Sequence, residues 1–157
     1  MTDDVRFMRL ALEEAKRAAA LGETPIGAVV VSGGEVIATA HNSRERNNDI
    51  TAHAELLAIR QAAEQRGDWR LGDCTVYVTL EPCPMCAGAL INSRIDRVVY
   101  GVEDAKAGCL GSVINFNSYP FNHAFSVTSG VCAKECANIL SDFFAAKRSE
   151  IKNKNNF

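Results

Sequence analysis

The chain has 157 residues, of which 47% are hydrophobic and 23% charged, and its formal net charge at pH 7 is −2. This length suits one domain with a sizeable core, and the composition excludes a largely disordered protein. The slightly negative charge argues against broad, non-specific binding of nucleic acid, although it allows a local basic patch around a site.

The sequence contains neither an apolar run long enough to cross a membrane nor the basic and apolar regions of a secretion signal. We therefore expect a cytoplasmic protein with no membrane partner. Six cysteines in a reducing compartment are better explained by metal binding, catalysis or core packing than by disulfide bonds.

The first predicted element is an amphipathic helix over residues 4–21, in which apolar residues recur at helical spacing. Two apolar segments, 26–32 and 35–41, flank a pair of glycines that favours a tight turn, so they are predicted to be antiparallel strands. The polar stretch 42–50 is predicted to be a loop. A second helix is expected to begin at His53 and to end near a glycine at position 67.

The middle of the chain alternates between strand and helix patterns. Residues 74–80 are typical of a buried strand, and Pro84 suits the first turn of a helix over 84–92. That helix is therefore expected to begin at Cys83. Residues 95–101 are predicted to form the next strand.

The last third of the chain gives weaker signals. Glycine, asparagine, serine and proline make residues 102–124 the least readable segment. A short last strand is predicted over 125–130 and a final helix over about 133–147. Residues from about 150 to 157 are expected to form a flexible basic tail.

Strands that alternate with helices after an opening hairpin predict an α/β fold. We expect one domain over residues 1–157, a three-layer α/β/α sandwich whose mixed five-stranded sheet carries helices on both faces. Trp69 and Tyr77 are expected to pack in its core. Ligands of such folds gather at the carboxyl ends of strands beside helix N-termini, which is where His53 and Cys83 are predicted to lie.

Two short motifs carry side chains that bind metals. Residues 51–55 read Thr-Ala-His-Ala-Glu, and residues 79–86 read Thr-Leu-Glu-Pro-Cys-Pro-Met-Cys. Two cysteines on a first helical turn can share one zinc ion, and a histidine from a neighbouring helix can supply a third ligand. We therefore predict one Zn²⁺ per chain, held by His53, Cys83 and Cys86. Three protein ligands leave a fourth position for water, as in catalytic zinc sites.

Glu55 follows His53 by two positions, so it is expected to lie beside the ion rather than on it. A carboxylate there can take a proton from water and deliver protons to a ring nitrogen and to a leaving amine. A lone C-x-x-C is more often a structural zinc site or a redox pair, and a lone H-x-E occurs by chance in many helices. In this order, however, H-x-E followed by P-C-x-x-C is typical of zinc-dependent nucleobase deaminases. Glu55 is therefore predicted to be the catalytic proton shuttle.

Two further cysteines leave one alternative open. Cys132 and Cys136 could complete a four-cysteine structural site with the C-x-x-C pair. Such a site would leave His53 and Glu55 without a role, and cysteines are also common as small core residues.

Several segments resemble the bacterial tRNA-specific adenosine deaminases, a family of the cytidine deaminase-like superfamily. The likeness extends along nearly the whole chain. It is carried by PIGAVVV (25–31), TAHAE (51–55), TLEPCPMCAGA (79–89), INSRI (91–95), YGVEDAKAG (100–108) and SDFF (141–144). The resemblance implies a cytidine deaminase-like fold and a homodimer that converts adenosine to inosine at the wobble position of tRNA-Arg. It also implies that the target base leaves the stack of the anticodon stem-loop.

The resemblance also assigns substrate-binding residues. Asn42 matches a side chain that hydrogen-bonds the bound nucleoside, while Asp104, Lys106, Asn122 and Phe144 match positions lining a groove for flanking nucleotides. Their chemistry suits RNA, because lysine can meet phosphate, amides can read base edges and an aromatic ring can stack on a base. Phe144 is equally compatible with a core position on a helix.

Two features depart from the family pattern: Pro84, where members often have valine, and residues 113–121, where a helical-looking segment is usual. They keep a second hypothesis open, a deaminase of a free base or nucleoside of the guanine or cytosine type. A third hypothesis is a zinc-stabilised RNA-binding module without catalysis. Glu55 disfavours it, because a structural zinc site needs no neighbouring carboxylate.

Overall fold

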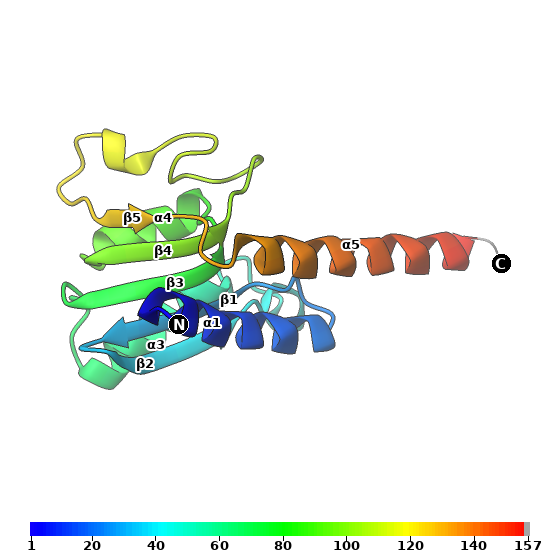
Figure 1. The fold of residues 1–157 in the computed structure, drawn as a ribbon, viewed down its shortest axis with the longest axis horizontal. Coiled ribbons are helices and arrows are strands. Elements are labelled where there is room, and N and C mark those ends of the chain that lie inside the picture. Colours follow the sequence, from blue (N-terminus) through cyan, green and yellow to red (C-terminus); the bar gives the residue numbers. More distant parts are fainter. Residues whose placement is uncertain (156–157) are drawn as a thin grey trace.

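The chain begins with a helix and a β-hairpin, and further helices and strands follow (Figure 1). The structure is a computed structural model that describes residues 1–155. Its elements are α1 (Asp3–Ala20), β1 (Gly27–Ser32), β2 (Glu35–His41), α2 (Arg44–Asn47), α3 (Ala54–Arg66), β3 (Cys74–Leu80), α4 (Pro84–Asn92), β4 (Arg97–Val102), the 3₁₀ turn η1 (Phe116–Ser118), β5 (Ser126–Thr128) and α5 (Ala133–Asn155). None of the helices in this described part is long and apolar enough to cross a membrane.

The five strands form one mixed sheet in the order β2-β1-β3-β4-β5. β1 runs antiparallel to β2 and β3, whereas β4 is parallel to both β3 and β5. Helices α1 and α5 cover one face, and α3 and α4 cover the other (Figure 1). The predicted three-layer α/β/α sandwich with a mixed five-stranded sheet is confirmed. Because β3 and β4 are parallel, the segments that follow both strands meet at one edge of the sheet.

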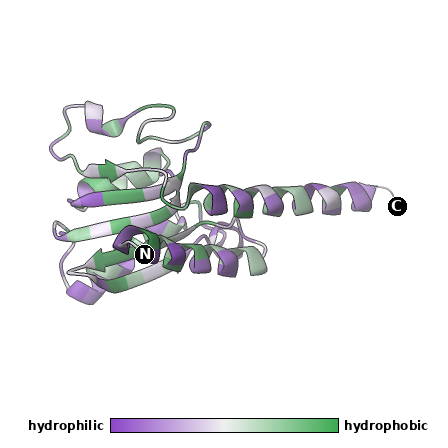
Figure 2. Cartoon of the chain, in the orientation of Figure 1, coloured by the Kyte–Doolittle hydropathy of each residue, from purple (hydrophilic) through white to green (hydrophobic). Residues whose placement is uncertain are grey.

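Apolar side chains fill the space on both faces of the sheet. Successive residues of a strand point to opposite faces, so Val30 packs toward α3 and α4 while Val29 packs toward α1 and α5. Coverage on both faces makes the central strands hydrophobic along most of their length, as Figure 2 shows. Tyr77 is buried as expected. The expectation for Trp69 was wrong, because its side chain is 51% exposed and lies against the guanidinium of Arg70.

Two expectations about element boundaries were also wrong. The polar stretch 42–50 contains the one-turn helix α2, and α5 runs to Asn155 rather than ending near residue 147. The segment from 148 to 155 contains no proline or glycine, so nothing in its sequence breaks the helix. Residues 156–157 of the expected tail lie outside the described residues.

Candidate metal centre

Two helix N-termini bring the proposed metal-binding residues together. His53 is the N-cap of α3, and Cys83 is the N-cap of α4, whose first residue is Pro84. The predicted starts of both helices are thus confirmed. The two helices lie on the same face of the sheet, so their first turns can face each other although 30 positions separate His53 from Cys83 along the chain.

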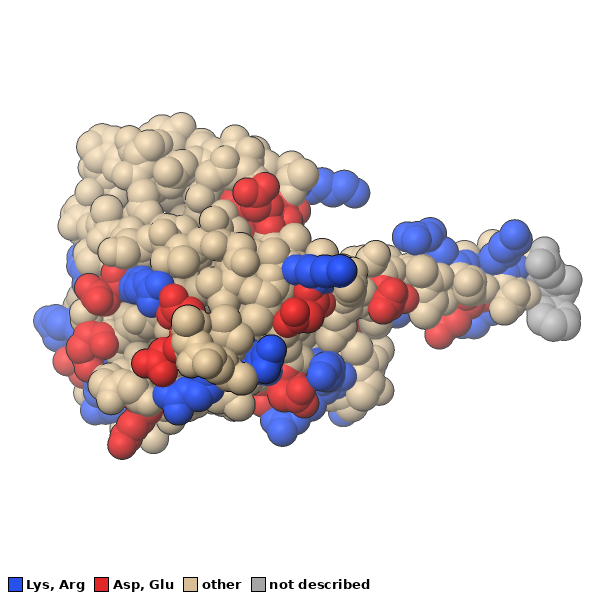
Figure 3. Space-filling model, in the orientation of Figure 1, with Lys and Arg blue, Asp and Glu red and all other residues tan. Residues whose placement is uncertain are grey.

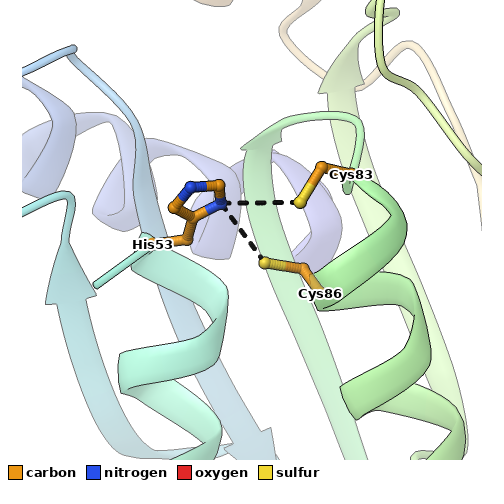
Figure 4. Close-up of side chains that lie close together, drawn as sticks. All are labelled: His53, Cys83 and Cys86. Atoms are coloured by element: carbon orange, nitrogen blue, oxygen red, sulfur yellow. Dashed lines mark hydrogen bonds between the residues drawn. The ribbon is translucent and has the colours of Figure 1, made fainter. Parts of the chain in front are cut away.

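The three side chains converge at a spacing that suits one zinc ion (Figure 4). His53 Nδ1 lies 3.5 Å from Cys83 Sγ and 3.5 Å from Cys86 Sγ. Nitrogen and sulfur ligands at ~2.0 and ~2.3 Å from a tetrahedral ion are about 3.5 Å apart, so both nitrogen–sulfur distances fit Zn²⁺. Within residues 1–155 no other group of three His, Cys, Asp or Glu side chains has its ligand atoms this close together.

The surroundings of these side chains favour a thiolate at one of the two cysteines, Cys83. A hydrogen bond with Cys86, followed by one with His53, lowers the pKa of Cys83 to about 4. The pKa of Cys86 is raised, because its thiol bonds Cys83 and is buried. The hydrogen bond with Cys83 also raises the pKa of His53. The N-termini of two helices add partial positive charge at the same place.

Glu55 lies in the first turn of α3 and is only 4% exposed. Burial raises the pKa of its carboxyl to about 7, although the charge of His53 and a hydrogen bond with Cys86 act in the opposite direction. The carboxyl is therefore next to the donor cluster, as the spacing of the motif predicts. A carboxyl with this pKa can both accept and donate a proton near neutral pH.

Asn42 has a structural contact that the sequence did not reveal. Its side chain is 5% exposed, and its Oδ1 accepts a hydrogen bond of 2.9 Å from the backbone N–H of Ala54, the first residue of α3. It therefore satisfies one of the unpaired N–H groups at the helix start that carries His53. This bond uses the amide oxygen and leaves the two N–H groups of Asn42 for another partner.

The segment after β4 carries Asp104 and Lys106. Asp104 Oδ1 accepts hydrogen bonds from the backbone N–H groups of Lys106 and Ala107 at 3.0 and 3.3 Å, so Asp104 caps a turn. The side chain of Lys106 is exposed. The turn lies beside the donor cluster, because the N–H of Cys109 bonds the carbonyl oxygen of Pro82 at 2.9 Å.

The other two proposed substrate residues lie elsewhere. Asn122 is exposed and precedes His123, whose Nε2 lies 2.7 Å from the carbonyl oxygen of Ile95, just before β4. Ile95 lies near the start of β4, whereas the metal-binding cysteines follow the end of the parallel strand β3, at the opposite end of the sheet. Asn122 is therefore not brought to the donor cluster of its own chain. Phe144 is 43% exposed on α5, which projects beyond the sheet (Figure 1).

The four-cysteine alternative is wrong. Cys136 packs with α1 and Tyr77 on one face of the sheet, whereas the donor cluster lies on the face covered by α3 and α4. A sheet therefore separates the two pairs of cysteines. Sequence reasoning also assigned no role to Glu23 and Glu81, two carboxylates that are 1% and 2% exposed. The feature of the sequence that could have identified them is a glutamate within an otherwise apolar or proline-containing motif.

The capping bond of Asn42 gives a first prediction. Asn42→Ala should lower the free energy of unfolding by about 1–2 kcal/mol, because it leaves the buried N–H of Ala54 unpaired. Asn42→Asp retains an acceptor oxygen and should lose clearly less. Denaturant unfolding of both variants measures the difference. Equal destabilisation by alanine and aspartate would show that the cap does not hold the start of α3.

The chain is similar to known proteins along most of its length. The MafB19-like deaminase family matches residues 2–148. A tRNA-specific adenosine deaminase of Bacillus subtilis is 50% identical over 153 residues, which cover 97% of this chain and 95% of that protein. One of Haemophilus influenzae is 48% identical over 151 residues, covering 95% and 87%. A solved structure from work on A-to-I editing by tRNA:A34 deaminases at the wobble position superposes with a TM-score of 0.84, at 48% identity, over 86% of this chain and 99% of that one.

Proposed function

Since the chain belongs to the bacterial tRNA-specific adenosine deaminases, a family of hydrolytic deaminases, we propose that it converts adenosine to inosine at the wobble position of tRNA-Arg. The observation that carries the deamination chemistry is the arrangement of His53, Cys83 and Cys86 beside a buried carboxyl, and the tRNA substrate is supported by the identity with tRNA-specific relatives. The reaction takes place in the cytoplasm, where tRNA is found. The anticodon stem-loop is the part of the substrate that the chain contacts.

His53, Cys83 and Cys86 hold one zinc ion per chain in this proposal. The spacing of their donor atoms fits the ion, and the low pKa of Cys83 suits a thiolate ligand. Zinc bound there supplies Lewis acidity, which activates water at neutral pH. The donors come from two helix starts that pack on one sheet, so the site is rigid before any substrate binds.

Glu55 moves the protons of the reaction. Its carboxyl is buried next to the donor cluster, where it can take a proton from the attacking water and deliver protons to a purine ring nitrogen and to the leaving amine. Asn42 orients the nucleoside with its two free N–H groups. Both side chains are fixed by α3, so the reacting groups share one rigid support.

Nucleotides that flank the target base are bound outside the metal centre. The exposed Lys106 meets a phosphate, and the turn that Asp104 caps lies beside the donor cluster. Phe144 on the projecting helix α5 offers an aromatic face, and the last turn of that helix carries Lys152 and Lys154. Figure 3 shows Lys and Arg side chains along α5, interspersed with Asp and Glu, and these cations can attract RNA although the whole chain is slightly acidic.

A homodimer is part of the proposal. Leu56, Trp69 and Ala89 line an apolar groove between α3 and α4. The exposed face of α4 includes Gly88, where nothing lies within 4 Å of the place that an added methyl group would take, so another helix can approach it closely. A second copy of the chain would cover this face. The dimer also offers a way to bring Asn122, distant from the centre of its own chain, to RNA on the partner.

The substrate is tested with the zinc-loaded chain. We expect inosine in a tRNA-Arg that carries a wobble adenosine and no conversion of adenosine, cytidine, cytosine or guanine. The same tRNA with guanosine at the wobble position is the control, because it shows whether adenosines elsewhere in the tRNA are converted. Conversion of a free base with unchanged tRNA would replace the proposed substrate by the free-base alternative. Tight tRNA binding without any conversion would favour a non-catalytic zinc module.

A further inference from the structure

A buried carboxylate lies between β3 and the metal-binding cysteines. Glu81 follows the last residue of β3 and is 2% exposed. Its Oε1 accepts a hydrogen bond from the N–H of Asp104 at 3.1 Å, and its Oε2 accepts from the N–H groups of Leu110 and Ser112 at 2.9 and 3.1 Å. The hydroxyl of Ser112 also donates to Oε1. All four partners are donors, so the ionised carboxylate is the form that fits.

These partners belong to one segment, residues 104–112, which we call the substrate loop. None of the ion pairs within residues 1–155 includes Glu81, so backbone N–H groups rather than a cation compensate its burial. The loop folds closely around the carboxylate, because a methyl group added at Gly108 would overlap the Glu81 carboxyl carbon and oxygens. The carboxylate therefore fixes where the loop lies.

The substrate loop connects the metal centre to the surface on which RNA is proposed to bind. Glu81 precedes Cys83 by two positions, and the loop residue Cys109 bonds the intervening Pro82 through its backbone. The same loop carries Lys106 with its exposed side chain. A shift of the carboxylate would move the lysine relative to the donor cluster.

We propose that Glu81 is a positioning residue, which holds the substrate loop against the metal-binding segment so that Lys106 meets RNA at a fixed distance from the reacting base. The inference rests on the proposed function, because it takes RNA to be the molecule that the loop contacts. The side chains of Cys109 and Leu110 also pack in the core, a contact that does not involve the Glu81 carboxylate. Loss of the carboxylate should therefore displace the loop without unfolding the chain.

The test compares Glu81→Gln with the wild-type chain on an anticodon stem-loop RNA. Glutamine has the same shape but turns an NH₂ group toward two of the donors, so the loop loses charged hydrogen bonds. We expect KM to rise about tenfold, which is the effect of losing the one charged hydrogen bond between Lys106 and a phosphate of the RNA. The kcat and the zinc content should stay nearly unchanged. Glu64→Gln, an exposed carboxylate on α3, is the control for net charge.

A positioning role predicts that Glu81 acts through Lys106. In Glu81→Gln the dependence of log KM on log salt concentration should become as shallow as in Lys106→Ala, a decrease of about 1 in slope. The double variant should then be no worse than the more impaired single variant. The proposal would be overturned if the increases in KM of the two single variants multiplied in the double variant. It would also be overturned if Glu81→Gln lost zinc and its kcat fell. If Glu81→Gln does not fold, Ser112→Ala should shift KM in the same direction by less.

Hydrogen exchange separates this proposal from the proposed function. The amides of Leu110 and Ser112 should exchange faster in Glu81→Gln than in the wild-type chain, and this readout needs no substrate. If these amides exchange faster in Glu81→Gln but the wild-type chain does not deaminate the RNA, the proposed substrate is refuted, whereas the role of Glu81 in holding the loop is supported. Unaltered exchange would overturn the role of Glu81 whatever the substrate is.

Discussion

Glu55→Gln is expected to lower kcat by at least ~10²–10⁴-fold, the range typical of general acid–base catalysis, while the chain keeps its zinc. Glutamine retains the volume of the buried side chain but cannot accept and release a proton. The carboxyl lies beside the donor cluster without belonging to it, so the metal should remain. Single-turnover kinetics and metal analysis of the same preparation measure both quantities.

Glu64→Gln provides a matched control, because it makes the same change at an exposed position of the same helix. It should leave kcat and zinc content as they are. Activity of Glu55→Gln at the wild-type level would refute the proton-transfer role. Loss of zinc in that variant would instead make Glu55 part of the metal-binding set.

Cys83→Ser is expected to abolish activity by removing the metal. An alcohol is a poor ligand for zinc, and removal of one of three protein ligands should weaken binding by more than the ~10–100-fold typical of outer-shell partners. Zinc content should fall from about one ion per chain to near zero after dialysis against a mild chelator. The same dialysis should leave zinc in the wild-type chain.

Cys132→Ser is the matched control for this second prediction. Cys132 is half-buried and lies with the α5 side of the sheet, away from the donor cluster. The serine variant should keep both its zinc and its activity. Equal loss of zinc from both variants would mean that α5 contributes to the metal site, against the separation of the two cysteine pairs by the sheet.

Local patterns predicted most of the fold. Short apolar runs rich in β-branched residues identified the strands. The residues at the starts of α3 and α4 were found because Pro84 and the helical spacing mark where each helix begins. Since a helix start fixes the direction of its first side chains, the meeting of His53 with the C-x-x-C pair could be predicted from sequence as well. The sequence could not tell that Nδ1, rather than Nε2, faces the sulfur atoms.

Contacts between distant segments could not be predicted. Glu81 bonds residues of the substrate loop, and Asn42 bonds Ala54, only because the sheet brings these segments together. Similarly, Asn122 was grouped with the other substrate residues, although its position depends on the irregular path of residues 103–125. The long α5 was underestimated because polar residues at its end gave no apolar pattern to follow.

X-ray absorption at the zinc edge tests the metal centre most directly. For His53, Cys83, Cys86 and one water molecule, we expect two sulfur atoms at ~2.3 Å and two nitrogen or oxygen atoms at ~2.0–2.1 Å. A shell of four sulfur atoms, or an active preparation that contains no metal, would contradict the open three-residue site on which the proposed deamination depends.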